Sequence, residues 1–281
     1  MEDARNEVPT DTTATDGKPS PARPLIIAVC NQKGGSAKTT TAVNIATCLG
    51  ALGCRVIVFD LDAQGNATRS FGVHPLPDVG AYDALCGDAP LVEVCLPTAC
   101  DRVALAPATP RLAFANLDLK AAEHSREIFL SLLEPLTGEV DVVVIDCPPT
   151  LGAMTVTAIA AADSLLVPVT ADPFAMDGLD RSWTLMRRLG TTQEAASGIL
   201  LIGEDASPLS VDLVKRIRRQ YGAAVYAATV PADLQVVQSN AASQPVCLYD
   251  PECPAAAAYL TLSREWMQRM RRASLGSLPV P

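Results

Sequence analysis

The chain has 281 residues, and its 31 acidic residues against 22 lysines and arginines give a formal net charge of −9. This charge argues against a protein that coats nucleic acid with its whole surface, although it is compatible with a local basic face. The length suits one large α/β domain or two small ones, and no apolar stretch approaches the length that spans a bilayer. We therefore expect a protein of the cytoplasm.

The amino-terminal residues 1–23 are rich in Thr, Asp, Pro and Ala and show no apolar periodicity. Such a composition predicts a disordered tail, and the lack of an apolar core argues against a signal peptide. A few ordered residues packed on the domain are the alternative for this segment. We expect a single domain over residues 24–273 and a flexible tail over residues 274–281.

The nine cysteines are scattered and include no C-x-x-C pair. Four of them, Cys30, Cys48, Cys54 and Cys147, lie in or beside predicted strands and helices, which favours buried, reduced thiols over disulfides or a metal site. The only histidines are His74 and His124. They lie far apart in the sequence, and we interpret them as ordinary surface residues.

The segment NQKGGSAKTTT, residues 31–41, lies between an apolar strand-like stretch, Leu25–Cys30, and a helix-like stretch with apolar residues at 42, 45, 46, 49 and 52. Strand, glycine loop, Lys-Thr and helix form the layout of a phosphate-binding loop. Its backbone N–H groups make an anion site, and the helix beginning at Lys38 adds its positive dipole end. We expect Lys38 to contact the β- and γ-phosphates and the Thr39 hydroxyl to hold Mg²⁺. The predicted phosphate-binding residues are Gly34, Gly35, Ser36, Ala37, Lys38, Thr39 and Thr40.

The loop departs from the standard pattern at two positions. Ala37 replaces the glycine expected before Lys38, and its Cβ costs about 1 kcal/mol if the backbone must take a positive φ. Lys33 is a second lysine at the start of the loop, from where a cation can reach a phosphate, including one bound to a second subunit. The alternative for the whole segment is a glycine turn with a solvated lysine.

Two carboxylates follow the next predicted strand, Arg55–Phe59. The C-terminal ends of parallel strands are where α/β sheets bind ligands. If the strand continues, Asp60 and Asp62 point the same way, because side chains repeat every second residue. We expect them to serve Mg²⁺ and the attacking water, with a solvated turn as the alternative.

A third motif is the β-branched run Val140–Ile145, which is followed by Asp146. Its pattern predicts a central parallel strand. Asp146 fits a Walker B carboxylate that holds Mg²⁺ through its water shell. An apolar run followed by Asp is weak evidence alone and strong evidence beside the phosphate loop.

Further predicted strands alternate with predicted helices along the chain. This alternation predicts an α/β fold with a doubly wound, mostly parallel sheet whose right-handed crossovers cover both faces. The strands are Val103–Ala106, Ser164–Val169, Gly198–Ile202 and Val225–Val230, and the helices include Ser125–Leu133, Leu179–Leu189 and Leu209–Tyr221.

The helix Leu209–Tyr221 is amphipathic, and its polar side carries Lys215, Arg216, Arg218 and Arg219. A basic face of this size can neutralise several phosphates of DNA without reading the sequence. A solvated helix face is the equally weighted alternative. The stretch Tyr259–Arg272 is also amphipathic, and we favour a helix packed on the sheet over a membrane-binding helix.

These motifs resemble those of the ParA/MinD family of deviant Walker A ATPases. The loop is similar to the family's Lys-Gly-Gly-x-Gly-Lys-Thr-Thr, and its flanks are similar to the ParA branch. Asp60–Asn66 resembles the switch I motif with Ala63 in place of proline, and Asp146–Gly152 resembles switch II with Thr150 in place of serine. The resemblance spans about residues 25–270 and is dense in the first half only.

The resemblance implies a P-loop ATPase that uses ATP and Mg²⁺ and forms an ATP-dependent homodimer. Lys33 would reach the ATP of the facing subunit, Asp62 would be needed for hydrolysis together with Lys33 and Lys38, and Thr39, Asp60 and Asp146 would hold the metal. Pro231, at the end of the last strand, would help to hold the adenine. Hydrolysis to ADP and phosphate is expected to be slow and stimulated by a partner.

The function implied is the partitioning or positioning of a cargo, either plasmid or chromosome DNA or a protein assembly. A ParB-like or other cargo adaptor would stimulate hydrolysis, and the ATP dimer would bind DNA without sequence preference on the nucleoid. The alternatives are a MinD-like switch on a membrane surface, which we favour less, and a nucleotide-dependent interaction module with little hydrolysis.

The family comparison itself weakens the DNA expectation. Family members bind DNA through arginines in two places, and rough alignment puts Ser207, Ala232 and Gln235 there. None of these residues is basic. DNA binding would therefore use the Lys215, Arg216, Arg218 and Arg219 face, or it would be weak or absent.

Overall fold

Eight strands form one sheet in the computed structural model, which describes residues 23–117, 125–171, 175–188, 196–204, 207–273 and 278. The strand order is β3-β4-β2-β5-β1-β6-β7-β8, and every pairing is parallel except that of β3 with β4. The predicted mostly parallel α/β sheet is therefore confirmed. The strands are β1 Leu25–Val29, β2 Val56–Asp60, β3 Leu96–Pro97, β4 Val103–Ala106, β5 Val142–Asp146, β6 Ser164–Thr170, β7 Gly198–Glu204 and β8 Val225–Pro231.

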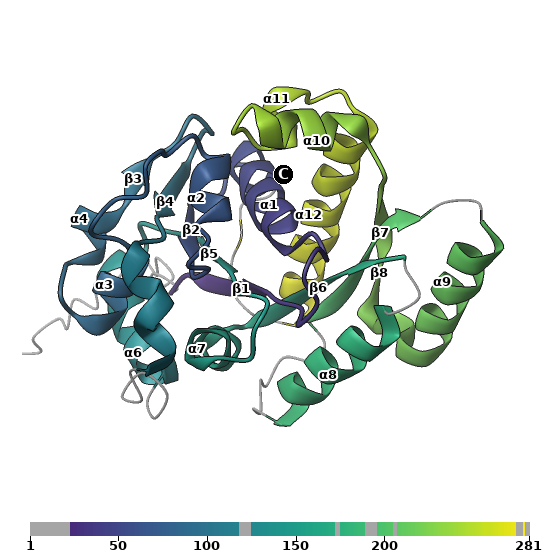
Figure 1. Ribbon diagram of the computed structural model, residues 1–281, viewed down its shortest axis with the longest axis horizontal. Helices are drawn as coiled ribbons and strands as arrows, with labels where there is room; N and C mark the ends of the chain where they lie inside the picture. Colours follow the sequence, from purple (N-terminus) through teal and green to yellow (C-terminus); the bar gives the residue numbers. More distant parts are fainter. Residues whose placement is uncertain are drawn as a thin grey trace, which may run out of the picture.

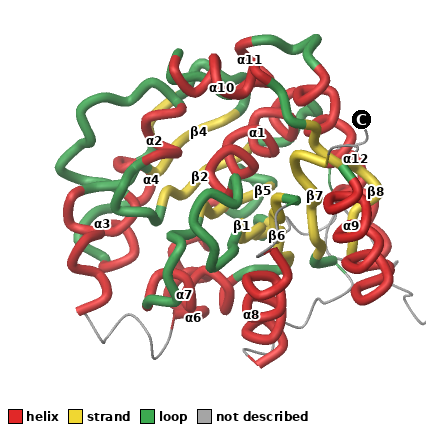
Figure 2. The backbone as a smooth tube through the Cα atoms, turned by 45° about the vertical axis from the view of Figure 1, so that its right-hand side comes forward, coloured by secondary structure: helices red, strands yellow, loops and turns green. Residues whose placement is uncertain are grey.

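Helices cover both faces of the sheet, as Figure 1 shows, and Figure 2 gives the same layers from another side. On one face lie α1 and α12 with α10 and α11, and on the other lie α6, α7, α8 and α9. The longer helices are α1 Lys38–Ala51, α6 Ser125–Leu133, α7 Ala153–Ala161, α8 Ala175–Arg188, α9 Pro208–Tyr221, α10 Leu234–Ala241 and α12 Pro254–Arg272. The short ones are α2 Asn66–Ser70, α3 Ala81–Cys86, α4 Leu91–Val94, α11 Val246–Tyr249 and the 3-10 turns Pro110–Leu117, Glu134–Leu136 and Gly222–Ala224.

The central strands are buried on both faces because successive side chains point to opposite sides. In β1, Ile26 packs into the core with α6 to α9, and Ile27 packs into the core with α1 and α12. The apolar run of β5 divides in the same way. These two cores hold the sheet rigidly, so the loops at its carboxyl edge start from fixed points.

The carboxyl edge of the sheet brings the three sequence motifs together. The central strands β1, β2 and β5 end level with one another, with Val29 and Asp60 both in register with Asp146. The phosphate loop leaves β1 there, and the two predicted carboxylate loops leave β2 and β5. The parallel sheet therefore places all three motifs at the carboxyl ends of neighbouring strands.

The carboxyl-terminal helix packs as predicted. Its apolar side chains are buried against β8 and α1, and they include Tyr259, Leu262, Trp266 and Met270. Arg269 donates to the carbonyl of Val225, and its guanidinium lies 3.9 Å from the centre of the Tyr226 ring. Arg23, the last residue of the predicted amino-terminal tail, donates to both carboxylate oxygens of Asp163. Residues 1–22 of that tail lie outside the described residues.

All nine cysteines are free thiols, and Cys30, Cys48, Cys54 and Cys147 are buried. His74 is exposed and its Nε2 lies 3.0 Å from the Ser243 hydroxyl, whereas His124 lies outside the described residues. None of the helices in the described ranges has the length and apolarity required to cross a bilayer.

Candidate nucleotide-binding site

The phosphate loop has the backbone that a phosphate cradle requires. Gly35 has a φ of 74°, and Ala37 has a φ of 59° and a ψ of 30°, both in the left-handed region. The strain expected at Ala37 is therefore present, because a Cβ is disfavoured at such a φ. Helix α1 begins directly after Ala37, so its first N–H groups and dipole end face the loop.

Two side chains of the loop converge on one carbonyl. Lys38 is only 7% exposed, and its Nζ donates to the carbonyl of Lys33 at 3.0 Å. The Ser36 hydroxyl donates to the same carbonyl at 3.0 Å. The loop is therefore closed by its own residues, and the ammonium of Lys38 lies at its centre, where a phosphate would compete for it.

Thr39 and Asp146 meet as the Mg²⁺ prediction requires. The Thr39 hydroxyl donates to Oδ2 of Asp146 at 2.7 Å. Asp146 is completely buried, and its Oδ1 has no hydrogen-bond partner among the described residues. A buried carboxylate oxygen without a partner is costly, and a hydrated cation would satisfy it. The described residues contain no group of three His, Cys, Asp or Glu side chains that holds a metal alone, so Mg²⁺ would also need phosphate and water ligands.

Asp60 is held more tightly by the protein than Asp146. Its Oδ2 accepts hydrogen bonds from the backbone N and the hydroxyl of Thr68, both at 2.7 Å, and its Oδ1 accepts from the N of Asp62 at 3.2 Å. The Thr68 hydroxyl in turn accepts from the N of Ala108 at 2.8 Å. Sequence reasoning missed Thr68, which lies eight residues after Asp60 and carries no motif of its own.

The sequence predicted that Asp60 and Asp62 point the same way if the strand continues to Asp62, but the strand is shorter than that. Strand β2 ends at Asp60, Leu61 is buried, and Asp62 lies in the following turn. The Oδ1 of Asp62 accepts from the N of Gln64 at 3.0 Å, which makes an Asx-type turn. Asp62 is partly exposed, so the two carboxylates have different environments.

Burial dominates the electrostatics of this edge. It raises the pKa of Asp60 to about 6 and raises the pKa of Asp146 well above its ordinary value, where the neighbouring Asp60 charge adds to it. Burial also lowers the pKa of Lys38, although Asp146 and Asp62 oppose this effect. Buried charges of both signs at one point form a site suited to a triphosphate with a divalent cation.

The predicted adenine residue, Pro231, is the last residue of β8. Two residues later, Asp233 caps α10 by accepting from the N of Gln235 at 2.9 Å, and it also accepts from the N of Ala255 in α12 at 3.1 Å. The segment after Pro231 is therefore fastened to the carboxyl-terminal helix.

The basic face of α9 is present as the amphipathic pattern predicted. Leu213 and Ile217 are buried. The four basic residues are all exposed, and they are Lys215, Arg216, Arg218 and Arg219. Arg218 also donates to the carbonyl of Tyr226 at 3.3 Å.

Two of the positions that rough alignment of the sequence pointed to, Ser207 and Ala232, lie near exposed apolar side chains. Ser207 caps α9 by accepting from the N of Ser210, which explains a serine there, and Leu209 beside it is exposed. Ala232 precedes α10, where Leu234 is 77% and Val237 is 64% exposed. The surface near these two positions is therefore apolar and not basic at Leu209, Leu234 and Val237.

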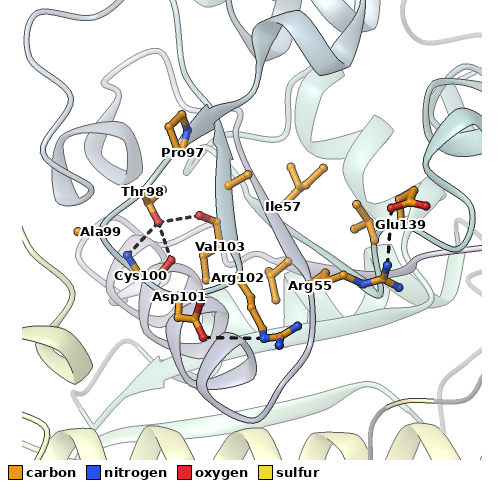
Figure 3. Close-up of a pocket in the computed structure, with 13 residues that line it drawn as sticks. Arg55, Ile57, Pro97, Thr98, Ala99, Cys100, Asp101, Arg102, Val103 and Glu139 are labelled. Carbon is orange, nitrogen blue, oxygen red and sulfur yellow. Dashed lines mark hydrogen bonds and ion pairs between the residues drawn. The ribbon is translucent and has the colours of Figure 1, made fainter.

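A pocket of about 640 Å³ lies at the opposite edge of the sheet, at the amino-terminal ends of β2 and β4 (Figure 3). Its charged side chains pair with protein groups, Arg55 with Glu139 and Arg102 with Asp101. The Thr98 hydroxyl donates to the carbonyl of Val103. These groups already have partners, so the pocket has less to offer a ligand than the carboxyl edge.

Comparison with known proteins places this geometry in a family. A family model described as an AAA domain matches residues 25–197. The chain is 35% identical over 246 residues to the sporulation initiation inhibitor protein Soj of Bacillus subtilis, covering 85% of this chain and 97% of Soj. It is 34% identical over 258 residues to the chromosome partitioning protein ParA of Caulobacter vibrioides, covering 89% and 97%.

A solved structure extends the comparison to three dimensions. Cobyrinic acid a,c-diamide synthase from Mycobacterium smegmatis, with bound ATP analog and magnesium, superposes with a TM-score of 0.76 at 28% identity, covering 92% of this chain and 98% of that one. The match of fold, motifs and sequence over most of the chain shows that it belongs to the ParA and Soj family of P-loop ATPases.

Proposed function

We propose that this protein is an ATP-driven switch that partitions or positions a cargo. Two subunits bind face to face around ATP, and hydrolysis separates them. The observation that carries the proposal is the contact of Thr39, in the first turn of α1, with Asp146, whose Oδ1 lacks a partner among the described residues. The buried ammonium of Lys38 lies in the same loop and donates to the carbonyl of Lys33. The chromosome-partitioning relatives supply the class of cargo system.

Each residue of the site has a defined role in this proposal. Lys38 and the backbone of residues 34–40 bind the phosphates, and Thr39 and Asp146 hold Mg²⁺, with Asp60 supporting the metal's environment. Bound Mg²⁺ neutralises developing charge on the phosphates. Asp62, in its exposed turn, aligns the attacking water, Lys33 reaches the nucleotide of the facing subunit, and Pro231 borders the adenine. Phosphoryl transfer depends mainly on such positioning and electrostatics, so slow turnover raised by a partner is the expected behaviour.

The ATP dimer binds DNA of any sequence through α9, and a ParB-like or other cargo adaptor stimulates hydrolysis. The exposed basic residues of α9 support this choice of surface. Because the chain is acidic overall, binding would depend on this one face and fall steeply with salt. The switch would then work in the cytoplasm on the nucleoid.

The test is a titration of arbitrary duplex DNA with ATP, with ADP and without nucleotide, at two salt concentrations. Binding that requires ATP and weakens with salt supports a nucleoid-bound switch. Binding of equal strength in all three nucleotide states contradicts it. Light scattering under the same conditions reports whether ATP alone joins two subunits.

A second candidate is a nucleotide-dependent interaction module that binds a protein and not DNA. It is favoured by the apolar surface of Leu209, Leu234 and Val237, near positions where the family carries DNA-binding arginines. ATP-dependent dimers that neither bind DNA nor release phosphate, alone or with a partner, would identify this function. The membrane alternative has less support, because the apolar side of α12 is already buried. Liposome binding that is lost on removal of the residues after Arg264 would revive it.

A further inference from the structure

The residue at the root of the phosphate loop, Asn31, uses both ends of its amide. Asn31 is 4% exposed, its Nδ2 donates to the carbonyl of Pro168 in β6 at 2.8 Å, and its Oδ1 accepts from the backbone N of Lys33 at 3.1 Å. The first bond fixes the side chain to the sheet. The second transfers that fixed position to the backbone of Lys33.

Helix α8 closes the other side of the same segment. The backbone N of Gln32 donates to the buried Ser182 hydroxyl at 3.3 Å. One turn earlier, Gly178 faces the loop so closely that a Cβ built there would lie 3.2 Å from Oδ1 of Asn31 and 3.4 Å from Cβ of Lys33. The φ of Gly178 is not in the left-handed region, so its close approach to the loop, and not its backbone, calls for a glycine.

The peptide groups on both sides of Lys33 are therefore held. Its N–H bonds to Asn31, and its carbonyl accepts from Ser36 and Lys38. A lysine side chain has many rotamers, and an immobile backbone limits the positions that its ammonium can reach. The Lys33 side chain then loses less conformational entropy when two subunits associate, and this stabilises the dimer.

We propose that Asn31 is a positioning residue for Lys33. Helix α8 forms the other side of this arrangement, because Gly178 leaves room for the Asn31 amide and for the Cβ of Lys33. The inference rests on the proposed function, in which Lys33 reaches the nucleotide of the facing subunit. It adds that the backbone position of Lys33 is fixed by contacts with β6 and α8, two elements that lie outside every nucleotide-binding motif of the sequence.

The experiment separates nucleotide binding by one subunit from joining of two subunits. Asn31→Ala and Gly178→Ala are each compared with the parent, and a fluorescent ATP analogue measures nucleotide affinity at protein concentrations below the dimer range. Light scattering with a non-hydrolysable ATP analogue measures the dimer dissociation constant. We expect both variants to weaken the dimer roughly tenfold to a hundredfold, while nucleotide affinity changes less than about threefold.

Gly178→Ala also distinguishes positioning from folding. Alanine favours a helix over glycine, whereas the close approach of its Cβ to Asn31 opposes this gain, so the melting temperature reports the net effect of the substitution on folding. A weaker dimer with an equal or higher melting temperature is therefore the specific signature of the proposal. Should Asn31→Ala fail to fold, this variant still decides the matter.

Asn44→Ala is the matched control. Asn44 is likewise a buried asparagine with both amide ends in use, since its Nδ2 donates to the carbonyl of Thr40 and its Oδ1 accepts from the N of Cys247. Neither bond involves Lys33. We expect a loss of stability similar to that of Asn31→Ala with an unchanged dimer dissociation constant.

Lys33→Ala shows which idea has failed when a result is negative. If Lys33→Ala abolishes the ATP dimer but Asn31→Ala and Gly178→Ala dimerise like the parent, the positioning role is wrong and the proposed function stands. If Lys33→Ala dimerises normally, the dimer model of the proposed function is wrong as well. Equal losses of nucleotide affinity and of dimerisation in Asn31→Ala would assign Asn31 to general loop folding and overturn the inference.

Discussion

The carboxyl edge of the sheet and the outer face of α9 both concentrate charge, but they hold it in opposite ways. At the sheet edge, Lys38, Asp60 and Asp146 are buried. On α9, the basic residues are exposed to solvent. A buried charge costs free energy unless it has a specific partner, whereas an exposed charge is screened by water and salt. The first region should therefore give large, all-or-none effects on mutation, and the second should give graded, salt-dependent ones.

The largest expected effect comes from Lys38, the buried cation at the centre of the phosphate loop. Lys38→Ala removes the ammonium that contacts the phosphates, so ATP hydrolysis should fall by at least roughly a hundredfold. Phosphate release, with the cargo adaptor or another stimulator present, is the measurement. Arg272→Ala, which changes an exposed cation at the end of α12, is the control and should keep the parent rate. Parent-rate turnover in Lys38→Ala would remove the site assignment.

Asp146→Asn tests the cost of the buried carboxylate. Because its folded pKa and that of Asp60 are raised, these groups contribute stability that is present below about pH 4 and is lost as the pH rises through the folded pKa, about 6 for Asp60. The nucleotide-free variant should thus be more stable than the parent at pH 8, by on the order of 1–3 kcal/mol, with a smaller gain at pH 5.

Thermal unfolding at pH 5 and pH 8, with and without ATP and Mg²⁺, measures both the cost of the buried carboxylate and its compensation by the bound cation. The parent should gain stability from ATP and Mg²⁺ at pH 8, since the cation compensates the carboxylate, and Asp146→Asn should gain little. A variant that is less stable than the nucleotide-free parent at pH 8 would show that the protein itself compensates the charge.

The exposed cations of α9 should give an intermediate and graded effect. Replacing Arg216 and Arg219 together by alanine should lower the slope of log affinity for DNA against log salt by about 2, since each lost phosphate contact contributes about 0.9. ATP-dependent dimerisation is the internal check and should not change. An unaltered slope would move DNA binding away from α9.

The smallest expected effect comes from Asp141, which pairs with Arg55 near the surface at 2.9 Å. Burial tends to raise the pKa of Asp141, but the hydrogen bonds from Arg55 outweigh it and lower the pKa below its ordinary value. Its contribution is thus present above about pH 4 and lost as the pH falls further, opposite in sign to that of Asp146. Asp141→Asn should destabilise the protein at pH 7 by only about 0.5–1 kcal/mol. Chemical denaturation at pH 7 and pH 3 measures the difference, and a loss of several kcal/mol would contradict the contrast drawn between exposed and buried charge.

The strands and most long helices were predictable because each repeats a pattern over enough residues to be recognised. The elements that sequence reasoning missed are mainly short, such as α2, α3, α4, α11 and the two-residue strand β3. So few residues form little stable structure alone and depend on packing for their conformation. The carboxyl end of β2 was equally hard to predict from sequence. The strand ends at Asp60, so Asp62 lies in the following turn and not in the strand.

The sequence by itself determined the phosphate loop, the two carboxylate-bearing strand ends and the amphipathic character of α9. These features depend on contiguous residues, on local backbone geometry and on the periodicity of side chains. Only the tertiary structure decided that Thr68 donates hydrogen bonds to Asp60, that Asp146 keeps an oxygen without a partner among the described residues, and that Gly178 of α8 lies against Asn31. Each of these depends on how closely segments apart in the chain approach one another, and that distance is set by packing of the whole domain.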